Sequence, residues 1–359
     1  MRVLVVANAD IGLYKFRKEL LVELVKNNEV YIALPKGEFY NELILIGCKY
    51  INTELDRHGI NPLKEIKVIL LYKKILKQIK PDIVFTYTIK PNIYAGMACA
   101  SLNIPYVANV TGLGTAVEKP GIMQFLTLNL YKIGLRKAKK VFFQNTENRD
   151  FMIRKGVVKD NYDLLPGSGV NLNNYTVSEY PNGDTIDFVF VSRIMKEKGI
   201  EQYLDAAKEI RKKYPETRFH ICGFCEEAYE EELKKLNDNG IIIYHGLVKD
   251  MASVYKQMSC TIHPTYYPEG LSNVLLESAA SGRPIITTNR PGCREVVDNG
   301  INGYVVREKD SNDLIEKIEL FLSKSVEERK QMGLAGRSKV EEEFNRQIVI
   351  NKYIAEMKM

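Results

Sequence analysis

Residues 2–34 of the chain, RVLVVANADIGLYKFRKELLVELVKNNEVYIAL, combine two hydrophobic patterns. Arg2–Ala7 and Glu29–Leu34 are nearly continuous apolar runs, which are typical of parallel strands covered on both faces. Between them, apolar side chains recur at the i, i+3, i+4 spacing of a helix from Leu13 to Leu24. The stretch therefore predicts a strand, a helix and a second strand parallel to the first.

The same alternation continues along the chain in two series that a loop-rich segment separates. Further strand candidates are Asp82–Tyr87, Tyr106–Val110, Val141–Gln144, Asp187–Val191, Arg218–Cys222, Ile241–Tyr244, Cys260–His263 and Pro284–Thr288. Repeated strand–helix units predict an α/β fold with doubly wound parallel sheets. The turn-rich segment Leu165–Tyr175 marks the expected linker. We therefore expect two Rossmann-like domains, residues 1–175 and 176–340, that face each other across a cleft. A last helix at 341–359 is expected to pack back on the first domain.

The composition is that of an ordinary globular protein, with 45% apolar and 27% charged residues among 359. No run of about 18 apolar residues predicts a membrane-spanning helix, and the N-terminus lacks the features of a signal peptide. The net charge of +6 is too small to indicate a nucleic-acid-binding protein. It hides an asymmetry, because residues 1–175 carry 25 Lys and Arg against 15 Asp and Glu (+10). Residues 176–359 carry 26 against 30 (−4).

The segment His263–Glu277, HPTYYPEGLSNVLLE, places two carboxylates around an expected helix start near Gly270. The free N–H groups and partial positive charge of a helix N-terminus suit a diphosphate. Glu269 precedes this start and Glu277 follows two turns later, so both can flank one ligand. Taken alone, the pair fits equally well an N-terminal Glu favoured by the helix dipole and a solvent-facing Glu.

The segment Val191–Gly199, VSRIMKEKG, supplies two cations at the end of another strand. We expect Arg193 and Lys198 at the carboxyl edge of the second sheet, where they and a helix N-terminus would clamp a diphosphate without a metal ion. As isolated residues they fit ordinary surface charges equally well.

Four motifs of the second half occur in a specific order. They are Arg193-x4-Lys198-Gly199, Glu269–Glu277, Gly282–Ile286 and Pro291–Val297. In this order they resemble the retaining nucleotide-sugar glycosyltransferases of family 4, which have the GT-B fold. The first half matches more loosely, through Gly12–Arg17, Tyr87–Asn92 and Val110–Thr115. These versions look like bacterial enzymes that extend sugars on undecaprenyl diphosphate in capsule, O-antigen or glycan assembly.

The resemblance implies a role for each matched residue. Arg193 and Lys198 would hold the donor diphosphate and stabilise the departing nucleotide, so that no metal or other cofactor is expected. Glu269 would complete the catalytic set by contacting hydroxyls of the donor sugar. The expected donor-binding residues are Glu277 at the ribose, Gly246 and Leu247 at the base, Gly270 and Leu271 through backbone N–H groups, and Gly12 in a first loop close to the reacting centre.

Three residues of the first half are expected at the acceptor, namely His58, Lys90 and Thr111. Many relatives carry a histidine at the position of Thr111, and a threonine cannot act as a base at neutral pH. This departure fits a front-face retaining mechanism in which the leaving phosphate takes the acceptor proton. His58 fits a plain loop residue as well as an acceptor contact.

Two basic amphipathic helices are predicted in the first half, over Leu63–Lys80 and Met123–Lys140. Such helices can lie on anionic lipid, although a lysine-rich solvated face is also common on helices of α/β proteins. We expect a cytoplasmic protein that binds peripherally to the anionic inner face of the cell membrane. Its expected partners are a nucleotide sugar, UDP-linked on resemblance, and a saccharide on a polyprenyl diphosphate, with no nucleic acid.

Two Rossmann-like halves also fit other functions. A nicotinamide-dependent oxidoreductase is disfavoured, because Gly112-Leu113-Gly114 lacks the third glycine of the dinucleotide fingerprint and an acid about 20 residues on. A nucleotide-sugar epimerase of related fold would bind the same donor without a lipid acceptor. A non-catalytic protein that binds sugar nucleotides is the third alternative. No spacing of His, Cys and carboxylates predicts zinc.

Overall fold

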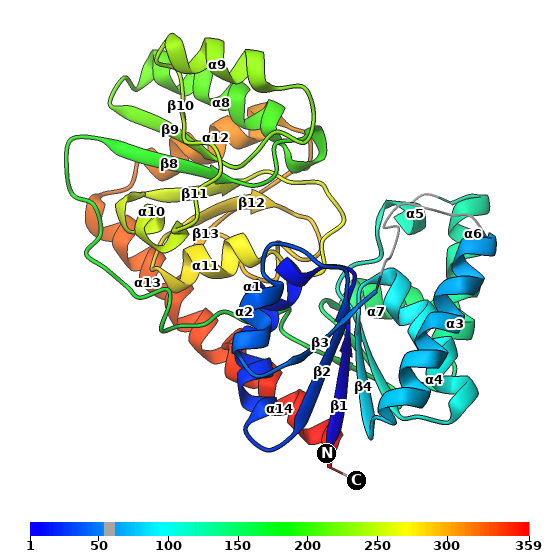
Figure 1. Ribbon diagram of the computed structural model, residues 1–359. Helices are drawn as coiled ribbons and strands as arrows, with labels where there is room; N and C mark the ends of the chain where they lie inside the picture. The colour runs from blue at the N-terminus through cyan, green and yellow to red at the C-terminus, as the bar shows by residue number, and fades with distance from the viewer. Residues whose placement is uncertain (54–61, 119, 359) are drawn as a thin grey trace. The chain divides into compact units, whose positions relative to one another are not determined.

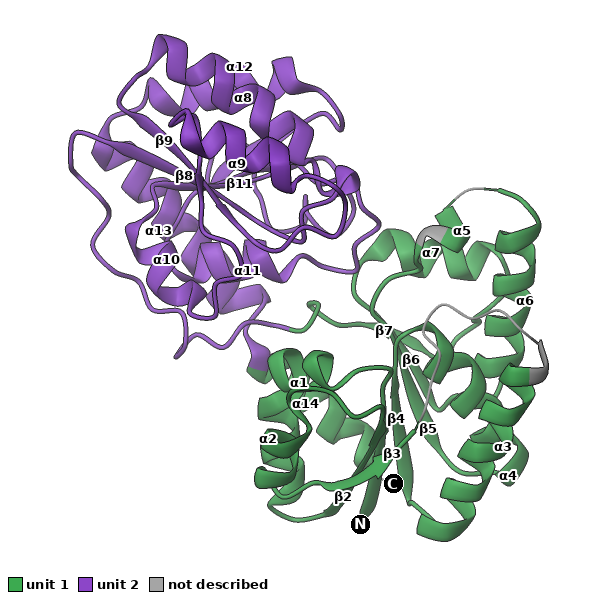
Figure 2. Cartoon of the chain, turned by 45° about the horizontal axis from the view of Figure 1, so that its top comes forward, with its two compact units in different colours: residues 1–168, 347–359 green, residues 169–346 purple. Residues whose placement is uncertain are grey.

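The strand–helix–strand pattern of residues 2–34 is present as β1 (Arg2–Val6), α1 (Asp10–Val25) and β2 (Glu29–Leu34) (Figure 1). The computed structural model describes residues 1–53, 62–118 and 120–358 of the chain. Contacts divide the chain into unit 1, residues 1–168 and 347–359, and unit 2, residues 169–346 (Figure 2).

Unit 1 is built on a parallel sheet, whose strand order in the described residues is β3-β2-β1-β4-β5-β6-β7. The other strands are β3 (Lys49–Asn52), β4 (Ile83–Tyr87), β5 (Tyr106–Val110), β6 (Lys140–Phe143) and β7 (Tyr162–Leu164). The other helices are α2 (Tyr40–Leu45), α3 (Pro62–Ile79), the π-helical η1 (Pro91–Ala95), α4 (Gly96–Leu102), α5 (Thr115–Glu118), α6 (Ile122–Leu135), α7 (Thr146–Arg154) and α14 (Arg346–Met357). Helices α1, α2 and α14 bury one face of the sheet, and α3, α4 and α6 bury the other (Figure 1). Burial on both faces explains the nearly continuous apolar strands.

Unit 2, which the structure describes throughout, is built on a parallel sheet of order β10-β9-β8-β11-β12-β13. Its strands are β8 (Ile186–Val191), β9 (Thr217–Cys222), β10 (Ile243–Tyr244), β11 (Cys260–His263), β12 (Ile285–Thr288) and β13 (Gly303–Val306). Its helices are the 3₁₀-helical η2 (Lys196–Lys198), α8 (Ile200–Lys213), α9 (Glu230–Asp238), α10 (Met251–Gln257), α11 (Asn273–Ala280), α12 (Ser311–Leu322) and α13 (Val326–Glu343).

Both sheets have the doubly wound order expected of Rossmann-like domains. The chain moves outward from β1 to β3 and then returns to place β4 beside β1, and it does the same with β8, β10 and β11. In such sheets, ligands bind at the carboxyl ends of the two strands where the order reverses. In unit 2 this position lies between the loops that follow β8 and β11.

The units divide after Ser168, whereas the sequence placed the division after Tyr175. The difference has a local cause in backbone hydrogen bonding. The N–H of Val170 donates to the carbonyl of Phe344 at 2.9 Å, and the N–H of Arg346 donates to the carbonyl of Val170 at 3.0 Å. These bonds attach the start of the predicted linker to unit 2.

The predicted last helix at 341–359 is interrupted in the structure. Helix α13 ends at Glu343, and α14 starts at Arg346, with its residues from 347 in unit 1. Between them, Asn345 pairs with Val170 in a β-bridge, and this extended backbone cannot continue a helix. From α14, the fully buried Tyr353 packs with its ring centre 5.0 Å from that of Phe85 on β4.

Candidate functional site

Two loops of unit 2 are packed together at the carboxyl ends of β8 and β11. The N–H of Tyr266 donates to the carbonyl of Glu197 at 2.9 Å. Gly199, which follows η2, has a φ of +80°, and a Cβ at this position would overlap the carbonyl oxygen of Pro264. Glycine is therefore favoured here both by the backbone conformation and by the close approach of the second loop.

This loop contact brings Lys198 and Glu269 together. The ammonium of Lys198 forms an ion pair with Oε1 of Glu269, and the two side chains are only 9% and 19% exposed. Burial alone would raise the pKa of Glu269, but the charge of Lys198 and its hydrogen bond outweigh burial and lower that pKa. Glu269 is therefore ionised at neutral pH and neutralises Lys198 in the ligand-free protein.

Arg193 is the second cation at this edge of the sheet, where it forms an ion pair with Glu226. Its guanidinium carbon lies 5.5 Å from the ring centre of Tyr267, and the ammonium of Lys198 lies 4.5 Å from the same ring centre. Tyr267 therefore contacts both cations through its aromatic face. Tyr267 was not a predicted site residue, although it stands only two positions before Glu269 in the sequence.

The helix beyond Glu269 starts later than the sequence predicted. Helix α11 begins at Asn273, not near Gly270. The N–H of Ser272 donates to the carbonyl of Gly292 at 2.8 Å, and its hydroxyl lies 3.3 Å from Nε2 of His263. These contacts hold Ser272 in the extended conformation of an N-cap, so the free N–H groups of the first turn begin at Asn273.

Two buried side chains support this loop. Leu271 packs into the hydrophobic cluster beneath α11, so only its backbone can contact a ligand. His263 is the last residue of β11, and burial followed by the charge of Lys198 lowers its pKa to about 3. The imidazole of His263 is therefore uncharged at neutral pH, and its neighbour Lys198 keeps Glu269 as its counter-charge.

Glu277 lies half-buried in the second turn of α11. Its neighbour is the hydroxyl of Tyr175, whose pKa is raised by burial and then by the negative charge of Glu277. Tyr175 also packs edge-on against the buried Tyr255, with ring centres 6.2 Å apart. Tyr175 was not a predicted site residue, and its contact depends on residues about 100 positions apart.

Gly246 and Leu247 follow β10 at the same edge of the sheet. The carbonyl of Gly246 accepts a hydrogen bond of 2.7 Å from the N–H of Gly223, the residue after β9. A Cβ at Gly223 would overlap the carbonyl oxygen of Ser192, the residue after β8. The loops that follow β8, β9 and β10 are thus packed backbone to backbone, while the side chain of Leu247 is 66% exposed.

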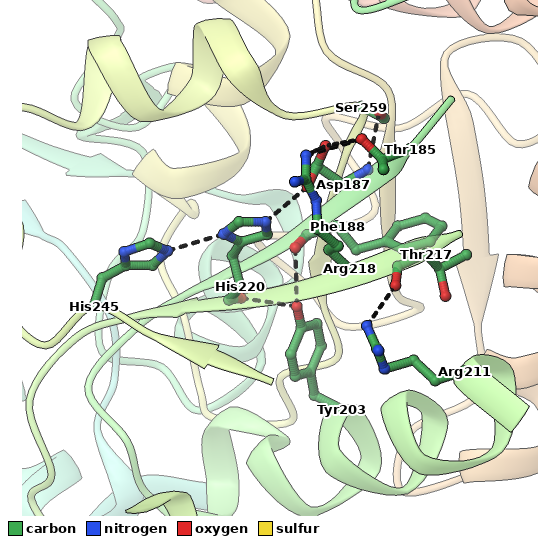
Figure 3. Close-up of polar contacts among 10 residues, drawn as sticks. All are labelled: Thr185, Asp187, Phe188, Tyr203, Arg211, Thr217, Arg218, His220, His245 and Ser259. Carbon is green, nitrogen blue, oxygen red and sulfur yellow. Dashed lines mark hydrogen bonds and ion pairs between the residues drawn. The ribbon is translucent and has the colours of Figure 1, made fainter. Parts of the chain in front are cut away.

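A chain of polar side chains leads along the sheet to the residue before Gly246 (Figure 3). Oδ1 of Asp187 lies 2.8 Å from Nε2 of His220, and Nδ1 of His220 lies 2.9 Å from Nε2 of His245. Arg218 donates to both carboxylate oxygens of Asp187, at 2.6 and 2.8 Å. Burial would raise the pKa of Asp187, but the hydrogen bonds from His220 and Arg218 lower it. These hydrogen bonds fix the orientation of the His245 imidazole and support the loop that begins at Gly246.

The remaining predicted residues belong to unit 1. Gly12 is the third residue of α1 and not part of a loop, because the helix already starts at Asp10. Space beside Gly12 is open, because no heavy atom outside its chain neighbours and the nearby backbone of its own helix lies within 4 Å of a Cβ built there. Lys90 forms an ion pair of 2.7 Å with Glu65, and both side chains are largely buried. Thr111 directly follows β5 and is half-buried, and His58 lies outside the described residues.

Among the described residues, no helix combines the length and the apolar character that crossing a bilayer requires. That part of the chain also contains no group of three or more His, Cys, Asp or Glu side chains that could hold a metal ion. Arg193, Lys198 and the first turn of α11 are the groups that can bind a diphosphate.

Both halves of the chain match protein families. Residues 175–339 match the family "Glycosyl transferases group 1", and residues 2–145 match the family "Glycosyl transferase 4-like".

Similar proteins of known name cover nearly the whole chain. An N,N'-diacetylbacillosaminyl-diphospho-undecaprenol alpha-1,3-N-acetylgalactosaminyltransferase of Campylobacter jejuni is 25% identical over 99% of this chain and 97% of its own length. The capsular polysaccharide biosynthesis glycosyltransferase CapM of Staphylococcus aureus is 29% identical over 96% of this chain and 93% of its own.

Solved structures share the fold over 99% of this chain. A glycosyltransferase from Rickettsia africae has a TM-score of 0.83 at 18% identity, and 97% of that protein is covered. Anabaena HepE in complex with UDP and glucose has a TM-score of 0.79 at 16% identity, and 98% is covered. These likenesses confirm the predicted pair of Rossmann-like domains of the GT-B fold.

Proposed function

The chain belongs to the glycosyltransferases that these two families describe, and we propose that it transfers a sugar from a UDP-linked donor to a saccharide on a polyprenyl diphosphate. The donor class is supported by the complexes of HepE, a protein of the same fold, with UDP. The acceptor class is supported by the Campylobacter relative, whose name specifies a diphospho-undecaprenol substrate, and by the capsular function named for CapM.

The observation that carries this proposal is the buried ion pair between Lys198 and Glu269, with Arg193 beside the same aromatic ring. The donor diphosphate binds Lys198, Arg193 and the N–H groups that begin at Asn273. Its charge then replaces Glu269 as the partner of Lys198. The released carboxylate of Glu269 accepts hydrogen bonds from hydroxyl groups of the donor sugar.

The nucleoside part of the donor follows the same edge of the sheet. Glu277 accepts hydrogen bonds from the ribose hydroxyls, and the nearby hydroxyl of Tyr175 orients its carboxylate. The base lies at Gly246 and Leu247, in the loop that is supported by the hydrogen-bonded side chains from Asp187 to His245. The backbone N–H groups of Gly270 and Leu271 contact the phosphate or the sugar.

The proposed reaction retains the anomeric configuration and needs no metal ion. The bond between C1 of the sugar and the diphosphate oxygen breaks, and its electron pair leaves with the nucleoside diphosphate. Lys198 and Arg193 stabilise the charge that develops on this leaving group. The acceptor hydroxyl oxygen bonds to C1, and its proton passes to the leaving phosphate, which fits the absence of a basic side chain at Thr111.

The acceptor lies on unit 1, with Lys90 and Thr111 as candidate contacts, while Gly12 keeps its expected place near the donor at the reacting centre. We place unit 1 against the inner face of the cell membrane as part of this proposal. Large apolar side chains on α6 are exposed, with Ile122 at 79% and Phe125 at 68%, and lysines accompany them on α3 and α6. Exposed apolar and cationic groups on one surface favour binding to anionic lipid.

The test is a transfer assay with a panel of UDP-, GDP- and ADP-sugars and a short-chain polyprenyl diphosphate saccharide as acceptor. We expect an acceptor product one sugar heavier by mass, formed with a UDP-sugar in the presence of EDTA, and with the same anomeric configuration as the donor by NMR. Conversion of the UDP-sugar without acceptor would indicate an epimerase instead. Binding of the nucleotide sugar without any product would indicate a non-catalytic binding protein.

A further inference from the structure

Unit 1 contains a cavity at the edge of its sheet opposite to the carboxyl ends of the strands. The cavity has a volume of about 630 Å³ and lies between the end of α6 and the segment 156–161, which leads into β7. This volume is in the range of about 300–1,000 Å³ that is usual for small-ligand sites. Buried apolar side chains line its inner part, namely Leu135, Ala138, Val157 and Val158.

Three exposed cations line the outer part of this cavity, Lys132, Arg136 and Lys159, together with the acidic Asp160. Within residues 1–53, 62–118 and 120–358, no side chain forms a hydrogen bond or an ion pair with any of the three. The neighbouring Lys137, in contrast, donates to the side chain of Asn103 at 3.0 Å. The three cations of the cavity are therefore available to a ligand.

Cations near a helix C-terminus also balance the partial negative charge of the helix, so this simpler role has to be weighed. Helices α6 and α7 both end near the cavity, at Leu135 and Arg154. Each C-terminus carries about half a negative charge, so the two ends and Asp160 account for about two of the three positive charges. A surplus of about one positive charge remains in the cavity, which favours an anion.

The exposed apolar face of α6 leads directly to this cavity. At 100° per residue, Ile122, Phe125, Leu126 and Ile133 share one face of the helix, and all four side chains are exposed. Lys132 and Arg136 flank the C-terminal end of this face. An apolar strip that ends at a cationic cavity matches the chemistry of a phospholipid, which has apolar chains below an anionic phosphate.

We propose that the cavity binds the headgroup of an anionic phospholipid, with Lys132, Arg136 and Lys159 contacting its phosphate. The exposed face of α6 then enters the apolar layer of the same leaflet. The proposal deepens the membrane association that forms part of the proposed function, and it rests on that association. It assigns the lipid to a defined cavity and not to surface charge in general.

The experiment compares two triple variants of the full chain that lose the same charge. The cavity variant is K132Q/R136Q/K159Q, and the control is K67Q/K74Q/K77Q on the exposed side of α3. Co-sedimentation uses vesicles of phosphatidylcholine with and without about 30 mol% phosphatidylglycerol, which is roughly the charge density of an anionic leaflet. General surface charge contributes about fivefold per cation, and this contribution is lost equally from both variants. We expect the cavity variant to lose at least about tenfold more affinity for the anionic vesicles than the control, because it also loses the contacts to the bound headgroup. Equal losses would overturn the proposal.

A second measurement separates a headgroup from a free phosphate. Soluble glycerophosphoglycerol and inorganic phosphate are titrated into each protein and followed by NMR. We expect glycerophosphoglycerol to bind the wild type and the control but not the cavity variant. Inorganic phosphate binding as tightly as glycerophosphoglycerol would overturn the headgroup assignment. Turnover of a water-soluble short-chain acceptor is measured in parallel. If the wild type shows no turnover, the proposed function is refuted, while the vesicle result still decides whether the cavity binds lipid.

Discussion

The substitution Gly199→Ala tests whether the packing of two loops in unit 2 positions Lys198. The φ of +80° at Gly199 costs an L-residue about 1–2 kcal/mol. In addition, the new methyl group would overlap the carbonyl oxygen of Pro264, so the two loops have to separate. A displacement of about 1 Å between reacting groups can lower a rate by about 100-fold.

Gly240→Ala is the matched control for this substitution. Gly240 has a φ of +68°, and no heavy atom other than those of Gly240 and its chain neighbours lies within 4 Å of a Cβ built there. We expect Gly240→Ala to lose about 1–2 kcal/mol in the free energy of unfolding in urea from the backbone conformation alone, and Gly199→Ala to lose more because of the overlap with Pro264. Only Gly199→Ala is expected to lose about 100-fold in kcat/KM for the nucleotide sugar. Equal kcat/KM values in the two variants would refute the role of the loop contact.

Three further variants test other parts of the molecule. Tyr175→Phe removes the hydroxyl beside Glu277. We expect the KM for the donor to rise about tenfold with little change in kcat, since a hydrogen bond to a charged group contributes about 1.5–3 kcal/mol. An unchanged KM would contradict this role. The pKa of Asp187 is lowered in the folded protein, so its contribution to stability is present at neutral pH and is lost as the pH falls below about 4. Asp187→Asn should therefore be less stable than the wild type in urea at pH 7, and this difference should shrink as the pH falls below about 4, whereas a constant difference would argue against this linkage. Phe125→Ser should weaken binding to anionic vesicles by about tenfold, because it removes an exposed aromatic side chain from α6. Turnover of a water-soluble acceptor should not change. Unchanged vesicle binding would exclude α6 from the membrane contact.

The strands could be predicted from the sequence wherever the sheet is buried on both faces. The runs around Phe85 in β4 and around Val189 in β8 are apolar because helices cover both faces of each sheet. The sequence analysis missed β3, β7 and β13, which are short and lie at the ends of their sheets. No residue of β3 or β7 is fully buried, so their hydrophobic pattern is weak, whereas β13 is mostly buried but offers only the three apolar residues Tyr304–Val306 after Gly303.

The site could be predicted in part for a related reason. Arg193, Lys198 and Glu269 each follow closely on a strand, and parallel strands bring their carboxyl ends to one edge of the sheet. The contacts that orient these residues depend on distant parts of the chain. Tyr175 reaches Glu277 across about 100 residues, and Asp187 reaches His245 through the register of three strands. No local pattern records such pairs, which is why the sequence analysis did not find them.

Calorimetric titration of UDP into the wild type and Lys198→Gln tests the central claim most directly, that Lys198 holds the donor diphosphate. Lys212→Gln is the control, because Lys212 is an exposed residue at the end of α8 that pairs only with Glu209 among the described residues. The account predicts that UDP binds about 10- to 100-fold more weakly to Lys198→Gln, the range expected for a lost hydrogen bond between charged groups, and that the control binds like the wild type. Equal affinity of UDP for all three proteins would contradict it.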